Sequence, residues 1–298
     1  MTKKIKFLNL GSHPITNNFL DTKKPKNEFF YNLNLIFHSD TKLVSLGKFV
    51  PPRKMFNNKY AHRASASKTM RHAYGKLAKL IKKKYKPKSI LEIGSNDGVF
   101  LKHFKKIKNL GVEPCKNLAK ITNSIGIKTY DRFWSMKLSN KIINQNNRFD
   151  VIYSANTISH IHNLSETFSA ISNSLNDKGI FILEDPSLME TIMQNSYDQF
   201  YDEHAYVFSV IALKNITKKS GLEIFKIEKL KTYGGSNRIY FKKSSNKKIK
   251  ISQEVFKHII NEKKFGINKI TTYKRFAKKV KKSKKNLIKI FKSLKKKK

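Results

Sequence analysis

The chain has 298 residues, of which 39% are hydrophobic, and its formal net charge is +43. This length supplies a real core for one large domain with appendages or for two modest domains. The single cysteine, Cys115, excludes an intrachain disulfide and any metal site with several thiolate ligands. No apolar run is long enough for a membrane span or a signal peptide, so we expect a cytoplasmic protein.

The strong positive charge has two interpretations. It is typical of proteins that bind nucleic acid or an anionic membrane surface. It also follows from the composition of an AT-rich genome, which enriches Lys, Ile and Asn together, as in this chain. Because the basic residues are mostly Lys and form no cluster with aromatic residues, we favour the compositional explanation and expect no specific nucleic-acid partner.

The hydrophobic pattern predicts alternating strands and helices. An amphipathic helix over 66–85 ends at Lys86-Pro87. The predicted strands are 29–37, 42–50, 88–94, 109–114, 149–156, 179–186, 220–230 and 236–243, and further helices lie at 97–107, 116–125 and 164–175. This alternation indicates an α/β fold with a doubly wound, mostly parallel, Rossmann-like sheet. We expect an N-terminal segment over 1–65, a central domain over 66–243 and a Lys-rich helical tail over 244–298.

The strongest local motif is the glycine loop from Glu92 to Gly98. A strand, Gly94, three residues, Gly98 and a predicted helix form a tight turn that lets a ligand approach backbone N–H groups. No Gly-Lys-Ser/Thr follows, so the loop is not a Walker A motif, and two glycines are too few for the dinucleotide fingerprint. The loop predicts a site for a nucleotide-like cofactor.

A carboxylate after the second strand of this unit complements the loop. Glu113 follows the loop by about 20 residues, where a carboxylate is suited to accept hydrogen bonds from two ribose hydroxyls. The alternative is an ordinary tight turn with an exposed glutamate. Asp97, inside the loop, either faces the cofactor's amine or caps the following helix.

Further segments occur in a fixed order along the chain. They are residues 10–20, 60–67, 111–134, 154–164, 182–192, 198–224 and 232–241. The Glu-x-Gly-x-x-x-Gly loop resembles the first motif of class I S-adenosylmethionine-dependent methyltransferases. The ordered set resembles the C-methyltransferases that act on nucleotide-linked deoxysugars, from about residue 8 to about residue 243. Its most specific part is the Tyr-Asp-Glu-His segment, residues 201–204, followed by Gly-Gly-Ser at 234–236.

The resemblance implies a class I methyltransferase fold, S-adenosylmethionine as cofactor and a nucleotide-linked keto sugar as substrate. The methyl group would pass to a carbon next to the ketone, which needs a base to remove its proton. The match implies His204 as this base, with Glu203 and Tyr201 beside it and Tyr60 or His62 as a further contact to the sugar. The backbone around Gly234, Gly235 and Ser236 would lie near the same pocket. The implied cofactor residues are Glu92, Gly94, Ser95, Asn96, Asp97, Gly98, Glu113, Pro114, Phe133, Ala155 and Asn156.

Several residues keep two interpretations. His160 and His162 follow a strand, and we favour a role in the turn over a catalytic one. Phe133 and Trp134 either stack on the adenine or pack in the core. Glu184 ends a strand at the edge where open sheets bind ligands, and serves either the site or a turn.

The chain departs from the family pattern at three places. The paired Cys-x-x-Cys motifs of the family's zinc site are missing, with His38 and Thr41 where the second pair would stand, so we expect no metal. In the segment 60–67, His62 and Ala64 replace a tyrosine and a serine, which puts the sugar preference in doubt. We also expect the family's C-terminal domain to be lacking.

These departures keep two alternatives open: a shortened, non-catalytic relative that binds anionic partners, and a methyltransferase for another acceptor. The sequence leaves the sugar, the methylated carbon and the oligomeric state undetermined.

Overall fold

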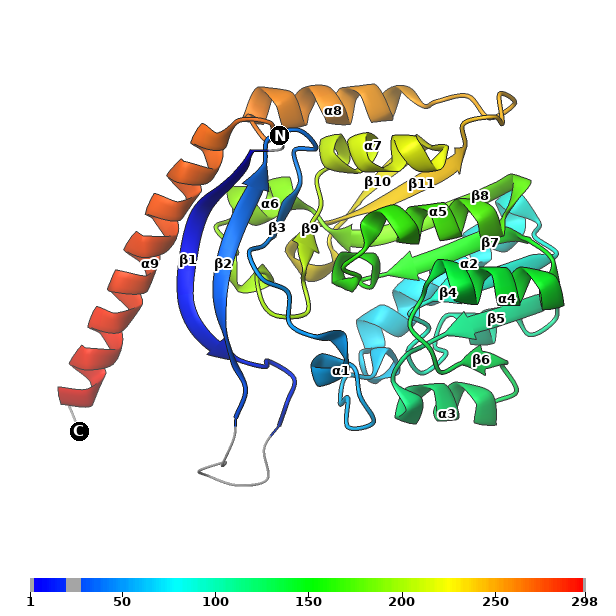
Figure 1. Cartoon of the computed structure of the whole chain (residues 1–298), viewed down its shortest axis with the longest axis horizontal. Helices are drawn as coiled ribbons and strands as arrows, with labels where there is room; N and C mark the ends of the chain where they lie inside the picture. The colour runs from blue at the N-terminus through cyan, green and yellow to red at the C-terminus, as the bar shows by residue number, and fades with distance from the viewer. Residues whose placement is uncertain (1–2, 20–27, 297–298) are drawn as a thin grey trace.

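The computed structural model describes residues 3–19 and 28–296. Its central sheet has seven strands: β4 (Ser89–Ile93), β5 (Lys108–Val112), β6 (Thr129–Tyr130), β7 (Phe149–Ala155), β8 (Leu175–Pro186), β10 (Leu222–Leu230) and β11 (Ser236–Lys243). They lie in the order β10-β11-β8-β7-β4-β5-β6 (Figure 1). The five neighbouring strands β8, β7, β4, β5 and β6 are parallel to one another, and β11 is antiparallel to both of its neighbours. The predicted mostly parallel α/β sheet is confirmed.

Helices cover both faces of this sheet. On one face lie α4 (Met136–Asn146), α5 (Leu164–Ser174) and α7 (Val210–Thr217), and on the other lies α2 (Lys68–Tyr85) (Figure 1). Helix α2 begins at Ser67, whose side chain accepts a hydrogen bond from the Met70 N–H. It then buries residues at helical spacing, among them Leu77 and Ile81, against the strands. The sheet is therefore doubly wound, as the alternation predicted.

The helix predicted over 97–107 is wrong. The structure has a short 3-10 helix there, Leu101–Phe104, before β5 begins. Gly98 has a φ of +76°, which interrupts helical backbone at the point where the helix was expected to begin. Buried side chains then follow one another at Val99, Phe100 and Leu101, without the polar face of a surface helix. The short helix α3 (Lys116–Ser124) agrees with the helix predicted over 116–125.

A second, antiparallel sheet lies beside the first. It consists of β1 (Lys4–Pro14), β2 (Phe30–His38), β3 (Val44–Leu46) and β9 (Tyr206–Val207), in that order. The sequence did not predict β1, because its pairing with β2 shifts register at two points and the polar–apolar alternation is broken there. Strand β9 follows β8 of the central sheet in the chain and pairs with β3, so a segment outside the N-terminal region completes the second sheet. The segment 10–20 ends at Leu20, which lies outside the described residues.

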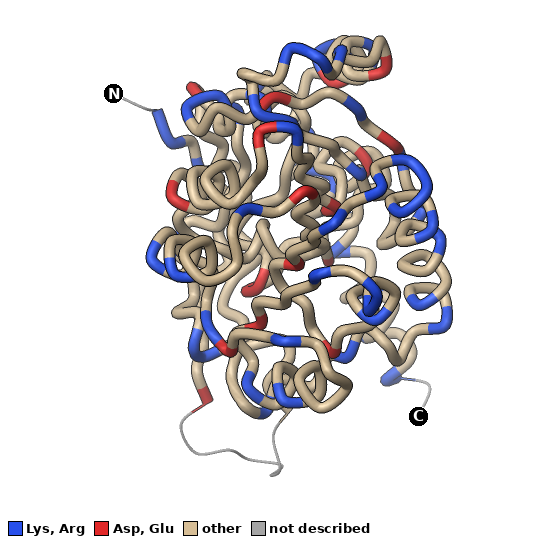
Figure 2. The backbone as a smooth tube through the Cα atoms, turned by 90° about the vertical axis from the view of Figure 1, so that its right-hand side faces the viewer, with Lys and Arg blue, Asp and Glu red and all other residues tan. Residues whose placement is uncertain are grey.

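The Lys-rich C-terminal region packs on the rest of the protein. It forms α8 (Gln253–Phe265) and α9 (Ile270–Lys296). The first half of α9 buries Tyr273, whose ring lies 5.1 Å from that of Phe7 and 4.8 Å from that of Phe37, measured between centroids. The second half is largely exposed. Figure 2 shows Lys and Arg along α9 and on elements throughout the chain. No helix within the described residues is long and apolar enough to cross a membrane.

One buried carboxylate attaches α8 to the central domain. Glu262 is fully buried and accepts hydrogen bonds from the backbone N–H groups of Val210 (2.8 Å) and Ile211 (2.9 Å), at the start of α7. We predict that Glu262→Ala lowers the free energy of unfolding by about 2–4 kcal/mol, because it leaves two buried donors without their acceptor. Urea unfolding measures this change. The exposed Glu254→Ala on the same helix should change it by less than about 0.5 kcal/mol, and equal effects would contradict this prediction.

Candidate active site

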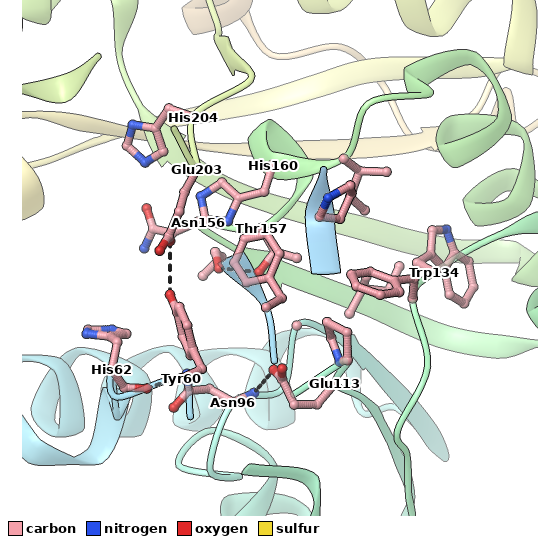
Figure 3. A pocket seen from close by; sticks show the side chains of 18 of the residues that line it. Tyr60, His62, Asn96, Glu113, Trp134, Asn156, Thr157, His160, Glu203 and His204 are labelled. Atoms are coloured by element: carbon pink, nitrogen blue, oxygen red, sulfur yellow. Dashed lines mark hydrogen bonds between the residues drawn. The ribbon is translucent and has the colours of Figure 1, made fainter. Parts of the chain in front are cut away.

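A cavity of about 650 Å³ opens at the carboxyl ends of the central strands. Strands β4, β5, β7 and β8 each end in residues that line it, as ligand sites in open α/β sheets generally do. The lining also includes residues of the N-terminal segment and of the loop before β9. Figure 3 shows Glu113 and Trp134 on one side of this cavity, and Glu203 and His204 on another.

The glycine loop and Glu113 form one hydrogen-bonded unit. The Gly94 N–H donates to the Val112 carbonyl oxygen at 2.8 Å, which directs the loop across the end of β5. The Glu113 carboxylate accepts the N–H groups of Asn96 and Cys115, each at 2.9 Å and each on a different oxygen. Burial raises the pKa of Glu113, and these two N–H groups oppose that rise. The carboxylate is therefore held rigidly at the cavity wall.

This unit fits the expected cofactor. A carboxylate has about four acceptor positions, so Glu113 keeps one on each oxygen for a pair of vicinal hydroxyls. Gly94 lets the Thr157 side chain pack closely against the loop. It has a φ of +77°, and a Cβ at this position would lie 2.0 Å from the Thr157 hydroxyl oxygen. The residues present are thus suited to a ribose-bearing ligand.

The loop over residues 60–66 is fastened to the glycine loop. The Asn96 side chain accepts the Ala64 N–H at 2.9 Å and donates to the His62 carbonyl oxygen at 3.2 Å. Asp97 accepts the Ser65 N–H at 3.3 Å. Asp97 caps no helix in the described part of the chain, which leaves one of its two sequence interpretations without support. Its other oxygen has no hydrogen-bond partner among the described residues.

The predicted cofactor residues divide into two groups. Gly94, Asn96, Glu113, Pro114, Phe133, Ala155 and Asn156 line the cavity. Glu92, Ser95, Asp97 and Gly98 are not among the described residues that line it. Glu92 is buried, and burial raises its pKa well above its ordinary value, with the charges of Glu113 and Asp97 adding to the rise.

Phe133 and Trp134 differ in their surroundings. Both line the cavity. The Trp134 indole donates to the Thr167 carbonyl oxygen at 3.4 Å, and its ring belongs to the hydrophobic core. Phe133 is 38% exposed. Of the two rings, Phe133 therefore has the more accessible face, whereas Trp134 is already packed.

His204 is held with a defined tautomer. Its Nδ1 lies 2.6 Å from the Gln199 carbonyl oxygen, which can only accept, so Nδ1 carries the proton. Nε2 then has its lone pair and lies 3.2 Å from the Tyr201 hydroxyl. Burial lowers the pKa of His204 to about 4, which keeps the imidazole neutral near pH 7. Tyr201, Glu203 and His204 all line the cavity.

Glu203 connects this loop to the N-terminal segment. Its carboxylate accepts the Asn17 amide at 2.6 Å and the Tyr60 hydroxyl at 2.9 Å (Figure 3 shows the latter). The neighbouring Asp202 accepts the hydroxyl of Thr16 at 2.6 Å. The N-terminal segment therefore builds one wall of the site. Tyr60 and His62 both line the cavity, and the structure brings all five predicted catalytic residues together.

The burial of Glu203 predicts how the stability of the protein depends on pH. Burial raises its pKa to about 7 from 4.5, although the Asn17 and Tyr60 hydrogen bonds oppose the rise. Between these values the folded state binds a proton that the unfolded state does not. The stability from this proton is complete below pH 4.5 and is lost as pH rises through 7. Glu203→Gln should therefore gain up to about 3 kcal/mol of unfolding free energy relative to wild type between pH 5 and pH 8. Urea unfolding of wild type and Glu203→Gln at both pH values measures this gain. A difference in unfolding free energy that is the same at pH 5 and pH 8 would reject the prediction.

His160, for which the sequence analysis favoured a role in the turn, belongs to the site. It lines the cavity, its ring lies parallel to that of Phe56 at 5.6 Å, and the His204 ring is 5.2 Å away. Burial lowers its pKa well below the ordinary value, and His204 and His62 lower it further. His162 also lines the cavity and stacks on Phe49. The sequence signal that could have placed both histidines at the cavity is their position shortly after the end of β7.

Other expectations near the site are corrected. Glu184 does not line the cavity but pairs with Arg238 at 2.6 Å. In the Thr-Tyr-Gly-Gly-Ser segment it is Tyr233 that lines the cavity, with a φ of +53°. Gly234, Gly235 and Ser236 are not among the described lining residues but directly follow Tyr233, so this segment does reach the cavity. The polar lining residues that the sequence interpretation did not name include Asn17, Arg53, Thr157, Asn163, Gln199 and Tyr233.

Three family models match successive parts of the chain. Residues 1–56 match a putative zinc binding domain, residues 60–227 a methyltransferase domain, and residues 231–298 a C-methyltransferase C-terminal domain. The last match corrects the expectation that this domain is lacking altogether, since residues 231–298 match its model. In the zinc-domain match the sequence has no cysteine, and the His38 ring bonds the Ser45 hydroxyl at 2.8 Å. No group of three or more potential metal ligands occurs among the described residues.

Among known proteins, the chain is similar to the C-methyltransferase NovU from Streptomyces niveus. The two are 24% identical over 276 residues, which cover 91% of this chain and 65% of NovU. The chain thus spans about two thirds of the length of this relative.

Similar solved structures include a possible histamine N-methyltransferase from Thermotoga maritima, 21% identical, which has a TM-score of 0.44 and covers 58% of this chain and 90% of its own. The PH0226 protein from Pyrococcus horikoshii is 14% identical, with a TM-score of 0.49 and coverage of 66% and 100%. The methyltransferase-domain model matches more than half of the chain. The chain therefore belongs to the family of S-adenosylmethionine-dependent methyltransferases.

Proposed function

We propose that this protein is a C-methyltransferase whose acceptor is a carbon next to the ketone of a nucleotide-linked deoxysugar, with His204 as the base. The observation that carries the proposal is the state of His204, a neutral imidazole that lines the cavity and whose unprotonated Nε2 accepts only the Tyr201 hydroxyl among the described residues. A carbon acid of this kind becomes nucleophilic only after its proton leaves. The similarity to a C-methyltransferase supports carbon as the atom that accepts the methyl group.

In the proposed mechanism, His204 Nε2 takes the proton from the sugar carbon, and the electron pair of the broken C–H bond moves into the ketone as an enolate. The Gln199 carbonyl oxygen accepts a hydrogen bond from the His204 Nδ1–H and so stabilises the imidazolium that forms. The Tyr201 hydroxyl, now facing a protonated Nε2, is free to donate to the enolate oxygen. Glu203 and Tyr60 orient the sugar from the adjacent wall.

S-adenosylmethionine, when bound, supplies an electrophilic methyl group to the nucleophilic carbon. We propose that Glu113 binds its ribose, that the backbone of the Gly94–Asn96 loop lies along its methionine part, and that Phe133 stacks on its adenine. Ala155 and Asn156, at the end of β7, complete this side of the cavity. With both ligands bound between these walls, little space would remain for water near the enolate.

Mass spectrometry of a panel of nucleotide-linked sugars, incubated with methyl-labelled cofactor, tests the proposed acceptor. We expect the label on 4-keto sugars and on no sugar without a ketone. Labelling of non-sugar acceptors alone would reject the sugar while retaining a methyltransferase. The absence of transfer to any acceptor, with cofactor binding intact, would favour a binding protein over an enzyme.

A further inference from the structure

One wall of the cavity carries a cation that has no partner within residues 3–19 and 28–296. Among the described residues that line the cavity, Arg53 is the only Lys or Arg. It lies in the short helix α1 (Pro52–Met55). The acidic residues of the same lining are Glu113 and Glu203, and both have hydrogen-bond partners from other segments.

The Arg53 guanidinium makes no hydrogen bond or ion pair with any part of the chain that the structure describes. Its neighbour Lys54 differs, because the Lys54 ammonium lies 4.5 Å from the centre of the Phe29 ring and does not line the cavity. A guanidinium remains charged across the physiological pH range and presents a planar fork of donors that matches phosphate oxygens. Arg53 is thus available to an anionic ligand.

The position of Arg53 is fixed relative to the proposed base. Met55, in the same helix, is buried in the core of the second sheet. Phe56 follows directly, and its ring stacks on His160, whose ring lies 5.2 Å from that of His204. Pro51 and Pro52 restrict the backbone that leads into the helix. The backbone at Arg53 is therefore held close in sequence to the rings that surround His204, and the Arg53 side chain is exposed.

We propose that Arg53 binds the diphosphate of the nucleotide-linked substrate and thereby makes a phosphorylated acceptor a requirement of this site. The inference rests on the proposed function, because it assigns the anionic part of the same substrate. A sugar carbon at His204 leaves its diphosphate pointing to a wall of the cavity, and Arg53 supplies the charge there. The high net charge attracts anions generally, whereas Arg53 gives one defined contact.

Calorimetry on the full chain tests this contact, with S-adenosylhomocysteine present and with thymidine and thymidine diphosphate as probes at about 150 mM salt. We expect wild type to bind the diphosphate at least about tenfold more tightly than the nucleoside. Arg53→Gln should remove most of this preference, Arg53→Lys should retain part of it, and Lys54→Gln should leave it unchanged. A preference that is absent in wild type, that survives Arg53→Gln, or that falls equally in Lys54→Gln would overturn the proposal.

The assay also separates this inference from the proposed function, since it requires no turnover. Thermal unfolding and S-adenosylhomocysteine binding establish that each variant is folded. A phosphate preference that depends on Arg53, found in a protein that methylates no sugar, would reject the acceptor and keep the phosphate site. Methylation of a nucleotide-linked sugar at equal KM in wild type and Arg53→Gln would reject the phosphate site alone.

Discussion

His204→Asn should lower the rate of methyl transfer by about 10²–10⁴-fold while leaving cofactor binding nearly unchanged. The asparagine amide can still donate to the Gln199 carbonyl oxygen, so the loop keeps its main support, but no lone pair remains to take the proton. Turnover with labelled cofactor and calorimetry with S-adenosylmethionine measure the two effects. The exposed His72→Asn on α2 is the matched control and should change neither.

The same variant has a signature that a merely structural histidine lacks. In D₂O, wild type should exchange the proton next to the ketone of a bound 4-keto sugar, and His204→Asn should not. Because burial lowers the pKa of His204 to about 4, protonation of this imidazole should reduce kcat/KM only as the pH falls toward that value. Loss of cofactor binding in His204→Asn, or unchanged exchange, would show that His204 is structural.

Glu113→Ala should weaken S-adenosylmethionine binding by at least about 30-fold, because it removes the acceptors for both ribose hydroxyls. It also leaves the N–H groups of Asn96 and Cys115 without their buried partner. Glu113→Gln keeps one acceptor oxygen and should lose less affinity. Calorimetry measures the dissociation constants, and thermal unfolding without ligand shows that each variant is folded.

Asp131→Ala is the control for this loss, since it removes a carboxylate of equal charge that pairs with Arg132 on the surface and does not line the cavity. We expect its affinity to equal that of wild type. A comparable loss in Asp131→Ala would assign the effect to net charge instead of to the site. Unchanged binding in a folded Glu113→Ala would exclude the ribose contact.

The sequence predicted the parts of the site that depend on local pattern. The strand before Gly94 and the carboxylate at Glu113 are near in sequence, and their pairing follows from adjacent parallel strands. It did not reveal that Asn17 and Tyr60 hold Glu203, because these contacts join residues about 140 to 190 positions apart. Such long-range hydrogen bonds leave no periodic signal along the chain.

Other differences have equally specific causes. Strand β1 was not predicted because its register with β2 shifts at two points, and Asn17, which lines the site, follows shortly after this strand. Helices α4 and α7 were not predicted, and α7 is short and largely buried, so it lacks a clear polar face. The Lys-rich composition of the C-terminal region indicated a solvated tail. Instead, Glu262 attaches it to α7 and Tyr273 packs on the second sheet, and neither side chain stands out in the sequence among the surrounding lysines.

The most direct test of the central claim is the NMR spectrum of the product formed with ¹³C-methyl-labelled S-adenosylmethionine and a nucleotide-linked 4-keto sugar. The proposed mechanism predicts that the labelled methyl group is bonded to the sugar carbon next to the ketone and that its formation requires His204. A labelled methyl group bonded to oxygen or nitrogen, or one that forms equally well in His204→Asn, would contradict it.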